Sequence, residues 1–212
     1  MMDKMIPYFD VVMVRPEADA RGAAYVTPAL PEGYRHAMYA EGDMAGWCRI
    51  ETAVAEFDSE DQARGYFERT FLPYPEELTR RMVFIQDPDG KAIADAAAWW
   101  QDDETLGRVH LLHWVAVHPD AQGLGLGRTV VCKALSLFPT LGLETGGRNA
   151  DIWLTTQTWS HVAIGLYLSL GFRAHRTYRL GGHENGFEGA ARTLEGVMRP
   201  ADYEKFIETA IG

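Results

Sequence analysis

Cysteine is scarce in this chain, and long apolar runs are missing. The 212 residues include two cysteines, Cys48 and Cys132, which lie far apart and show no metal-ligand spacing. We therefore expect free thiols and no bound metal, in a protein of the reducing cytoplasm. No apolar run approaches the roughly 20 residues that cross a bilayer. Residues 1–5 lack the charged and apolar regions of a secretory signal, so we expect no membrane partner.

Positive charge is also in short supply. The chain has 20 lysines and arginines and 30 aspartates and glutamates, which gives a net charge of −10. Without a basic stripe to neutralise phosphates, nucleic acid is not an expected partner. The acidic balance would suit a cationic small molecule, but it also keeps many proteins soluble. An apolar fraction of 47% and a charged fraction of 24% are typical of a globular protein, and the length fits one domain.

The spacing of apolar residues predicts a mixture of short strands and helices. The expected strands are residues 8–14, 34–39, 82–86, 91–100, 109–117 and 151–156, with a hairpin turn at 87–90. The expected helices are residues 43–57, 60–71, 76–81, 126–138 and 160–170, with Ser59 and Ser160 as N-caps and Gly171 after the last helix. Residues 101–107 and 142–149 are expected loops, followed by a tail of one or two strands and a helix near 201–209. This pattern predicts one α+β domain.

The most informative segment runs from Val115 to Arg128. An apolar strand passes through Pro119 into a loop with glycines at 123, 125 and 127, which opens onto an amphipathic helix. Such a loop points successive backbone N–H groups at one spot, at the positive end of the helix dipole, and so favours a phosphate or pyrophosphate. Taken alone, the same glycines would equally fit a corner that only bends the chain.

A second motif, Ala163-x-x-x-Tyr167-x-x-x-Gly171-Phe172, lies downstream. With the glycine loop and the 45-residue interval from Gln122 to Tyr167, it resembles the GCN5-related N-acetyltransferase (GNAT) superfamily over about 109–173. The family signature Gln/Arg-x-x-Gly-x-Gly/Ala appears as Gln-Gly-Leu-Gly-Leu-Gly at 122–127. The resemblance implies a GNAT fold, with a central mixed, mostly antiparallel sheet that splays at the acyl-CoA site and carries helices on both faces. It also implies a single domain over 1–212, in which 1–81 shape the acceptor site and 109–173 bind acetyl-CoA.

The resemblance further implies which residues hold the donor, acetyl-CoA. The loop N–H groups and Arg128 would bind the pyrophosphate, and the strand backbone would pair with the pantetheine amides. Ser160 stands where the family often has an asparagine that contacts the cofactor, which puts that side-chain contact in doubt. The implied set is Val115, Val117, Gln122, Gly123, Leu124, Gly125, Gly127, Arg128 and Ser160.

Two residues are candidates for proton transfer. By the resemblance, Tyr167 would protonate the departing CoA thiolate. His113 would take a proton from the acceptor amine, a task that suits imidazole, although a histidine bonded within the sheet is an equal alternative. His110 is a weaker candidate, and His118 adjoins the loop as a structural or cofactor-side residue.

The acceptor is less well defined. The segments that build this site in the family contain aromatic and acidic residues that would suit an amine, or that simply form core. They are Trp47, Glu51, Glu56, Trp99, Trp100, Thr156 and Trp159. Asp95 is expected either near the acceptor or paired with an arginine, a choice left open.

We therefore expect an acetyl-CoA-dependent N-acetyltransferase that transfers the acetyl group directly to a primary amine of a small molecule or peptide. A non-catalytic acyl-CoA-binding or regulatory module is the alternative, which the Ser160 departure supports and the presence of both Tyr167 and His113 argues against. A Rossmann-type dinucleotide enzyme does not fit, because Arg128 stands where that motif needs a small residue. The amine, the acyl chain preference and a homodimer stay open.

Overall fold

The computed structural model describes residues 2–16, 26–141 and 150–212. They form two compact units, each built from segments that are distant in the sequence. We call residues 26–99 and 112–141 the central unit, and residues 2–16, 100–111 and 150–212 the terminal unit. The long strands β4 (Ala92–Asp103) and β5 (Gly107–Val117) each contribute residues to both units. The predicted loop at 142–149 lies outside the described residues.

The described strands hydrogen-bond in the order β2-β3-β4-β5-β6-β1-β7. The remaining strands are β1 (Asp10–Arg15), β2 (Arg35–Met38), β3 (Met82–Gln86), β6 (Ile152–Gln157) and β7 (Arg173–Ala174). The pairs β1–β6, β1–β7, β2–β3 and β3–β4 are antiparallel, whereas β5 and β6 are parallel. The predicted α+β fold with a mixed, mostly antiparallel sheet is confirmed.

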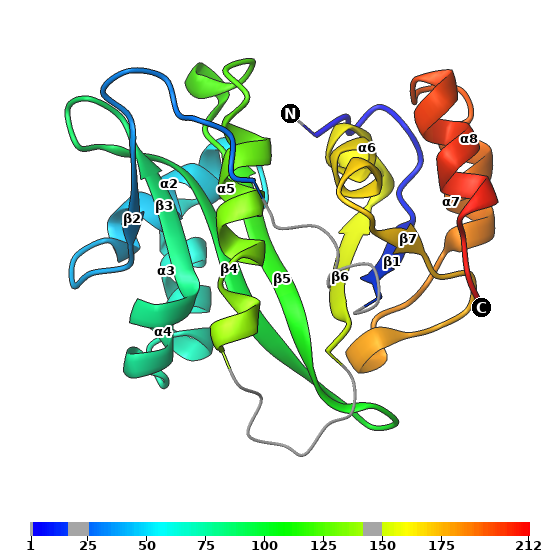
Figure 1. Ribbon diagram of the computed structural model, residues 1–212, viewed down its shortest axis with the longest axis horizontal. Helices are drawn as coiled ribbons and strands as arrows, with labels where there is room; N and C mark the ends of the chain where they lie inside the picture. The colour runs from blue at the N-terminus through cyan, green and yellow to red at the C-terminus, as the bar shows by residue number, and fades with distance from the viewer. Residues whose placement is uncertain (1, 17–25, 142–149) are drawn as a thin grey trace. The chain divides into compact units, whose positions relative to one another are not determined.

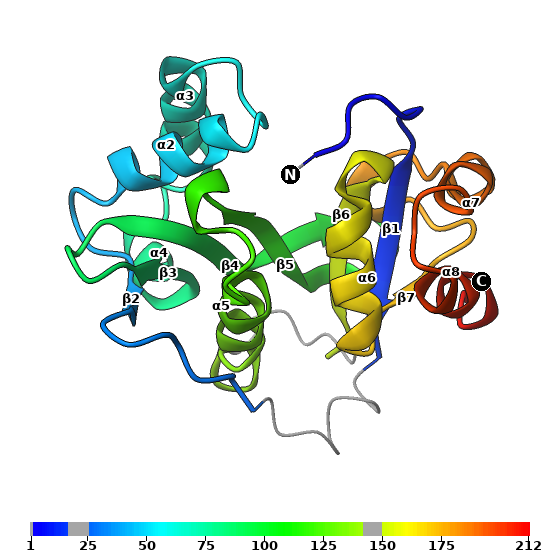
Figure 2. The same cartoon turned by 90° about the horizontal axis from the view of Figure 1, so that it is seen from above.

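In the central unit, helices pack on both faces of the strands. The helices are α2 (Met44–Ala53), α3 (Glu60–Thr70), α4 (Pro75–Arg81) and α5 (Leu126–Leu135). Figures 1 and 2 show α2 and α3 on one side of β4 and α5 on the other. The predicted β3–β4 hairpin is confirmed, because the Asp87 N–H donates to the Lys91 carbonyl at 3.0 Å and Gly90 adopts a φ of +83° in the turn.

Capping explains where the first helices begin and end. The Ser59 hydroxyl accepts a hydrogen bond from the Gln62 N–H at 3.3 Å, which confirms the predicted N-cap of α3. The prediction that the preceding helix reaches residue 57 is wrong, since α2 ends at Ala53. Ala55 has a φ of +67°, and a left-handed residue cannot continue a right-handed helix. The predicted helix 126–138 is likewise shorter, ending at Leu135.

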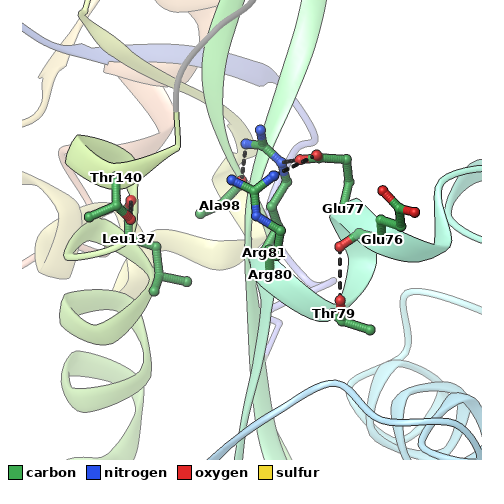
Figure 3. Close-up of polar contacts among 8 residues, drawn as sticks. All are labelled: Glu76, Glu77, Thr79, Arg80, Arg81, Ala98, Leu137 and Thr140. Atoms are coloured by element: carbon green, nitrogen blue, oxygen red, sulfur yellow. Dashed lines mark hydrogen bonds and ion pairs between the residues drawn. The ribbon is translucent and has the colours of Figure 1, made fainter.

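A buried arginine ties α4 to the sheet (Figure 3). Arg81 is 4% exposed, and its guanidinium forms an ion pair with Glu77 one turn earlier and donates to the Ala98 carbonyl of β4 at 3.1 Å. Glu77 also pairs with the exposed Arg80 at 2.9 Å. These bonds satisfy the buried charge, which would otherwise be costly, and they hold α4 against β4.

The terminal unit combines β1, β6 and β7 with α6 (His161–Ser169), α7 (Phe187–Leu194) and α8 (Pro200–Glu208). The sequence prediction missed α7, although Phe187, Ala190 and Leu194 lie buried at helical spacing. It was also wrong to place a loop at 101–103, because β4 continues to Asp103. No helix in the described part of the chain is long and apolar enough to cross a membrane.

Candidate active site

The glycine loop follows β5 in the central unit and adopts the backbone that only glycine adopts without strain. Gly123 and Gly125 have φ values of +83° and +78°, and Gly125 is the left-handed N-cap of α5. A Cβ added at either position would meet no atom within 4 Å, so open space adjoins both Cα atoms. Gly127 lies in the first turn of α5, where backbone N–H groups have no intrahelical partner. The loop therefore has the room and the donors that an anion needs.

Most of the other predicted donor residues lie in this loop or next to it in the chain. The Gln122 side chain donates to the Val117 carbonyl at 3.0 Å and so ties the loop to the end of β5. Val115 and Val117 are half-buried, whereas Ala116 between them is buried. Leu124 is 50% exposed, and Arg128 is exposed on the first turn of α5. All the predicted donor residues except Ser160 thus lie in the central unit.

Tyr167 lies in the terminal unit, three residues before the C-cap of α6. The helix ends in a Schellman motif, in which the Phe172 N–H donates to the Tyr167 carbonyl at 3.1 Å and the Gly171 N–H donates to the Leu168 carbonyl at 3.2 Å. Gly171 supplies the left-handed φ of +89°. The rings of Tyr167 and Phe172 pack edge to face at 5.9 Å, and Tyr167 is 6% exposed. The Gly-Phe ending of the motif therefore fixes the tyrosine ring.

His113 lies on β5 beside a break in the strand's regular geometry. Trp114 has a φ of +45°, which is rare for a residue with a side chain. In a regular strand, consecutive side chains point to opposite faces, yet His113 and Trp114 both contact Tyr66 of α3. The Tyr66 hydroxyl lies 3.5 Å from His113 Nε2 and accepts from the Trp114 indole N–H at 3.2 Å. All three side chains are half-buried.

Two acidic side chains meet in the interior of the central unit. Glu51 of α2 and Asp95 of β4 are 1% and 0% exposed. Burial raises the pKa of both carboxyls, and the negative charge of Asp95 raises the pKa of Glu51 further. No N–H or hydroxyl group of the described residues donates to either Asp95 oxygen. Burial therefore favours the protonated form of both carboxyls, and Asp95 lies against another carboxyl rather than an arginine.

Comparison with known proteins identifies the family. A family model described as an acetyltransferase (GNAT) domain matches residues 79–174, which include β5, the glycine loop and Tyr167. The chain belongs to the GCN5-related N-acetyltransferase superfamily.

Its relatives include curated mycothiol acetyltransferases. The enzyme of Mycobacterium marinum is 40% identical over 167 residues, which cover 70% of this chain and 50% of the relative. The enzyme of Rothia mucilaginosa is 31% identical over 153 residues, which cover 68% of this chain and 42% of the relative. The chain thus spans about half the length of the curated relatives it matches.

A solved structure supports the fold. The GCN5-related N-acetyltransferase of Sphaerobacter thermophilus aligns with a TM-score of 0.56 and 18% identity, over 79% of this chain and 49% of that one. At this identity the likeness shows the GNAT fold alone.

Ser160 departs from the prediction for this GNAT chain. It precedes α6 at the N-cap position, but its hydroxyl makes no capping hydrogen bond. Its φ and ψ of −96° and 35° differ from the extended backbone of a capping serine. Instead, the Gln157 side chain donates to the Ser160 hydroxyl at 3.4 Å.

The residues proposed for the acceptor side differ widely in exposure. Trp47, Trp99 and Glu51 are at most 4% exposed and belong to the core of the central unit. Trp100 is half-buried under the Arg108 guanidinium, and the Trp159 indole donates to the Ile6 carbonyl at 2.8 Å. Thr156 is 8% exposed on β6.

The two other histidines that the sequence analysis considered also have defined places. His110 is 7% exposed on β5 in the terminal unit. His118 accepts from the Asp120 N–H at 3.4 Å and caps the short helical turn before the loop. Sequence reasoning missed Tyr66, although Ala63 and Phe67 beside it mark the inward side of α3.

Proposed function

We propose that this GNAT chain is an acetyl-CoA-dependent N-acetyltransferase that transfers the acetyl group directly to a primary amine. The observation that carries the proposal is the glycine loop, with two left-handed glycines, open space at their Cα atoms and a helix N-terminus behind them. The names of the relatives support acetyl transfer as the reaction. Because the chain covers half of those relatives, their substrate is one candidate among several.

The donor would lie along β5 and the loop. The N–H groups of Gly123, Gly125 and Gly127 would donate to the pyrophosphate oxygens, beside the Arg128 guanidinium. The backbone of Val115 and Val117 would hydrogen-bond the pantetheine amides like an added strand. Bound in this way, acetyl-CoA supplies an activated thioester carbonyl.

Three proton transfers accompany the reaction. The neutral amine nitrogen attacks the thioester carbonyl carbon, the amide bond forms and the carbon–sulfur bond breaks. Tyr167 would donate its phenolic proton to the departing thiolate, which leaves as the CoA thiol, and the resulting phenolate would take the second proton that the nitrogen loses as it becomes an amide. An ammonium with a pKa of about 10.4 must first lose a proton, and His113 would receive it.

Binding of acetyl-CoA tests the donor site. We expect Gly125→Ala to weaken the affinity measured by calorimetry at least tenfold, since the methyl group would occupy the space proposed for the phosphate. Gly107→Ala is a matched control, because Gly107 also has a left-handed φ of +73° and open space around it but lies in the β4–β5 hairpin. Both variants should lose a similar stability of about 1–2 kcal/mol. Equal affinity in the two variants would contradict the assignment.

Tyr167→Phe tests the acid. It keeps the ring that packs on Phe172 and removes the proton, so we expect kcat to fall about 10²–10⁴-fold with an unchanged Kd for acetyl-CoA. Tyr203→Phe on α8 serves as a control tyrosine. An undiminished kcat in Tyr167→Phe would require another acid.

The acceptor should be sought in a panel of amines. We propose to follow release of the CoA thiol with amino acids, spermidine, aminoglycosides, short peptides and the unacetylated precursor of mycothiol. Acetyl-CoA binding without turnover on any of them would favour the non-catalytic acyl-CoA-binding module. The observation that favours this second candidate is at Ser160, where the family often carries asparagine and where the serine hydroxyl makes no capping hydrogen bond.

A further inference from the structure

The Tyr66 hydroxyl has a hydrogen-bonding direction that its neighbours determine. An indole N–H can only donate, so Tyr66 Oη must be the acceptor in its 3.2 Å contact with Trp114. The phenolic O–H is then left to donate elsewhere. Among the residues that the structure describes, the acceptor that an O–H of Tyr66 can reach is His113 Nε2, at 3.5 Å. Tyr66 therefore donates to His113, and the proton of the neutral imidazole lies on Nδ1.

The backbone of β5 is distorted to make this arrangement. The left-handed φ of +45° at Trp114 is disfavoured by about 1–2 kcal/mol for a residue with a Cβ. It turns the side chain of Trp114 to the side already used by His113, so both reach the same hydroxyl. Strain that persists in a folded protein often marks a functional position.

Aromatic packing holds the Tyr66 ring in place without closing it off from solvent. Its centroid lies 4.9 Å from Trp114, 5.6 Å from Phe57 and 6.2 Å from Trp47. Tyr66 and His113 are nevertheless both half-buried rather than buried. The second lone pair of Oη is therefore available to accept a hydrogen bond from a group outside the protein.

We propose that Tyr66 is a catalytic proton relay, which receives the acceptor amine's proton and passes its own to His113. This proposal rests on the proposed acetyltransferase function. The amine N–H⁺ bond breaks as a new O–H bond forms at Oη, while the original Oη–H bond breaks and the proton binds Nε2. The amine becomes neutral, Tyr66 is again a neutral phenol, and His113 becomes an imidazolium. The long 3.5 Å contact would shorten in the substrate complex.

The test compares Tyr66→Phe with Tyr39→Phe. Both substitutions remove one hydroxyl from an aromatic residue of the central unit, and Tyr39 stacks on Phe67 at 5.7 Å without touching His113. With saturating acetyl-CoA and the fastest amine of the panel, we expect kcat/KM for the amine to fall at least about 100-fold in Tyr66→Phe. We expect little change in Tyr39→Phe.

The pH profile separates a relay from a structural role. The rings of Tyr66, of Phe71 after α3 and of Trp114 face His113, and of these three only Tyr66 carries an ionisable group. In the wild type, kcat/KM should fall as the pH drops through the His113 titration, because imidazolium cannot accept a proton. In Tyr66→Phe that inflection should vanish, and His113→Gln combined with Tyr66→Phe should be no slower than His113→Gln alone. A wild-type rate and profile in Tyr66→Phe overturn the relay.

A measurement without turnover tests the hydrogen bond itself. In ¹⁵N NMR spectra, His113 should be the Nδ1–H tautomer in the wild type and lose that preference in Tyr66→Phe but not in Tyr39→Phe. An unchanged tautomer in Tyr66→Phe overturns the proposal. If the tautomer responds as expected but no amine in the panel is acetylated, the hydrogen bond from Tyr66 to His113 is present but the proposed function fails. The relay then fails because there is no reaction for it to serve.

Discussion

Replacing Asp95 by asparagine should make the protein gain stability relative to the wild type as the pH rises. The Glu51–Asp95 pair is fully buried, and burial raises the pKa of both carboxyls above their ordinary values. The folded chain therefore retains protons that the unfolded chain has already released. Since the folded state binds more protons, the contribution of this pair to the free energy of unfolding is largest at acidic pH. It decreases as the pH rises above about 4, where the unfolded chain begins to release these protons.

The size of the effect follows from the number of protons retained. Each proton that is held in the folded state but not in the unfolded state lowers the free energy of unfolding by about 1.4 kcal/mol per pH unit. Asparagine cannot titrate, so Asp95→Asn removes one of the two retained protons. Between pH 5 and pH 7 the variant should therefore gain up to about 2.7 kcal/mol relative to the wild type, the upper limit being one whole proton retained by Asp95 over two pH units.

Urea unfolding at pH 5, 6 and 7 measures this difference. Asp89→Asn, an exposed carboxyl in the β3–β4 turn, is the control and should follow the pH dependence of the wild type. If the curves of Asp95→Asn and the wild type run parallel, Asp95 does not retain a proton in the folded state and the reasoning is refuted.

Two glycine substitutions test the packing of the terminal unit. Gly189→Ala should lower the unfolding free energy by about 1–3 kcal/mol, because its methyl group would overlap the Phe9 ring where α7 packs on β1. Gly196→Ala, whose nearest atom would be 3.9 Å away, should cost much less, and equal losses would disprove the overlap. Gly171→Ala should cost about 1–2 kcal/mol through its left-handed backbone, with its Cβ 3.3 Å from Arg15 Nε. An unchanged melting temperature would show that the end of α6 tolerates another geometry.

Local signals explain why much of the fold could be predicted. The hairpin turn, the Ser59 cap and the end of α6 each depend on residues within six positions of one another. The errors arose where distant contacts decided the outcome. The continuation of β4 to Asp103 is one case, because the Asp103 carboxylate accepts from the Tyr178 hydroxyl at 2.6 Å, 75 positions away.

The sequence by itself determined the glycine loop and the tyrosine helix, because both depend on φ values that glycine alone adopts easily and on fixed short spacings. Those spacings were enough to indicate the GNAT family and its donor, while the acceptor stayed open. Only the tertiary structure brought His113 to Tyr66 and Glu51 to Asp95. The reason is that each of these two pairs joins a helix residue to a strand residue more than 40 positions away. Local periodicity does not indicate which side chains will meet over such a separation.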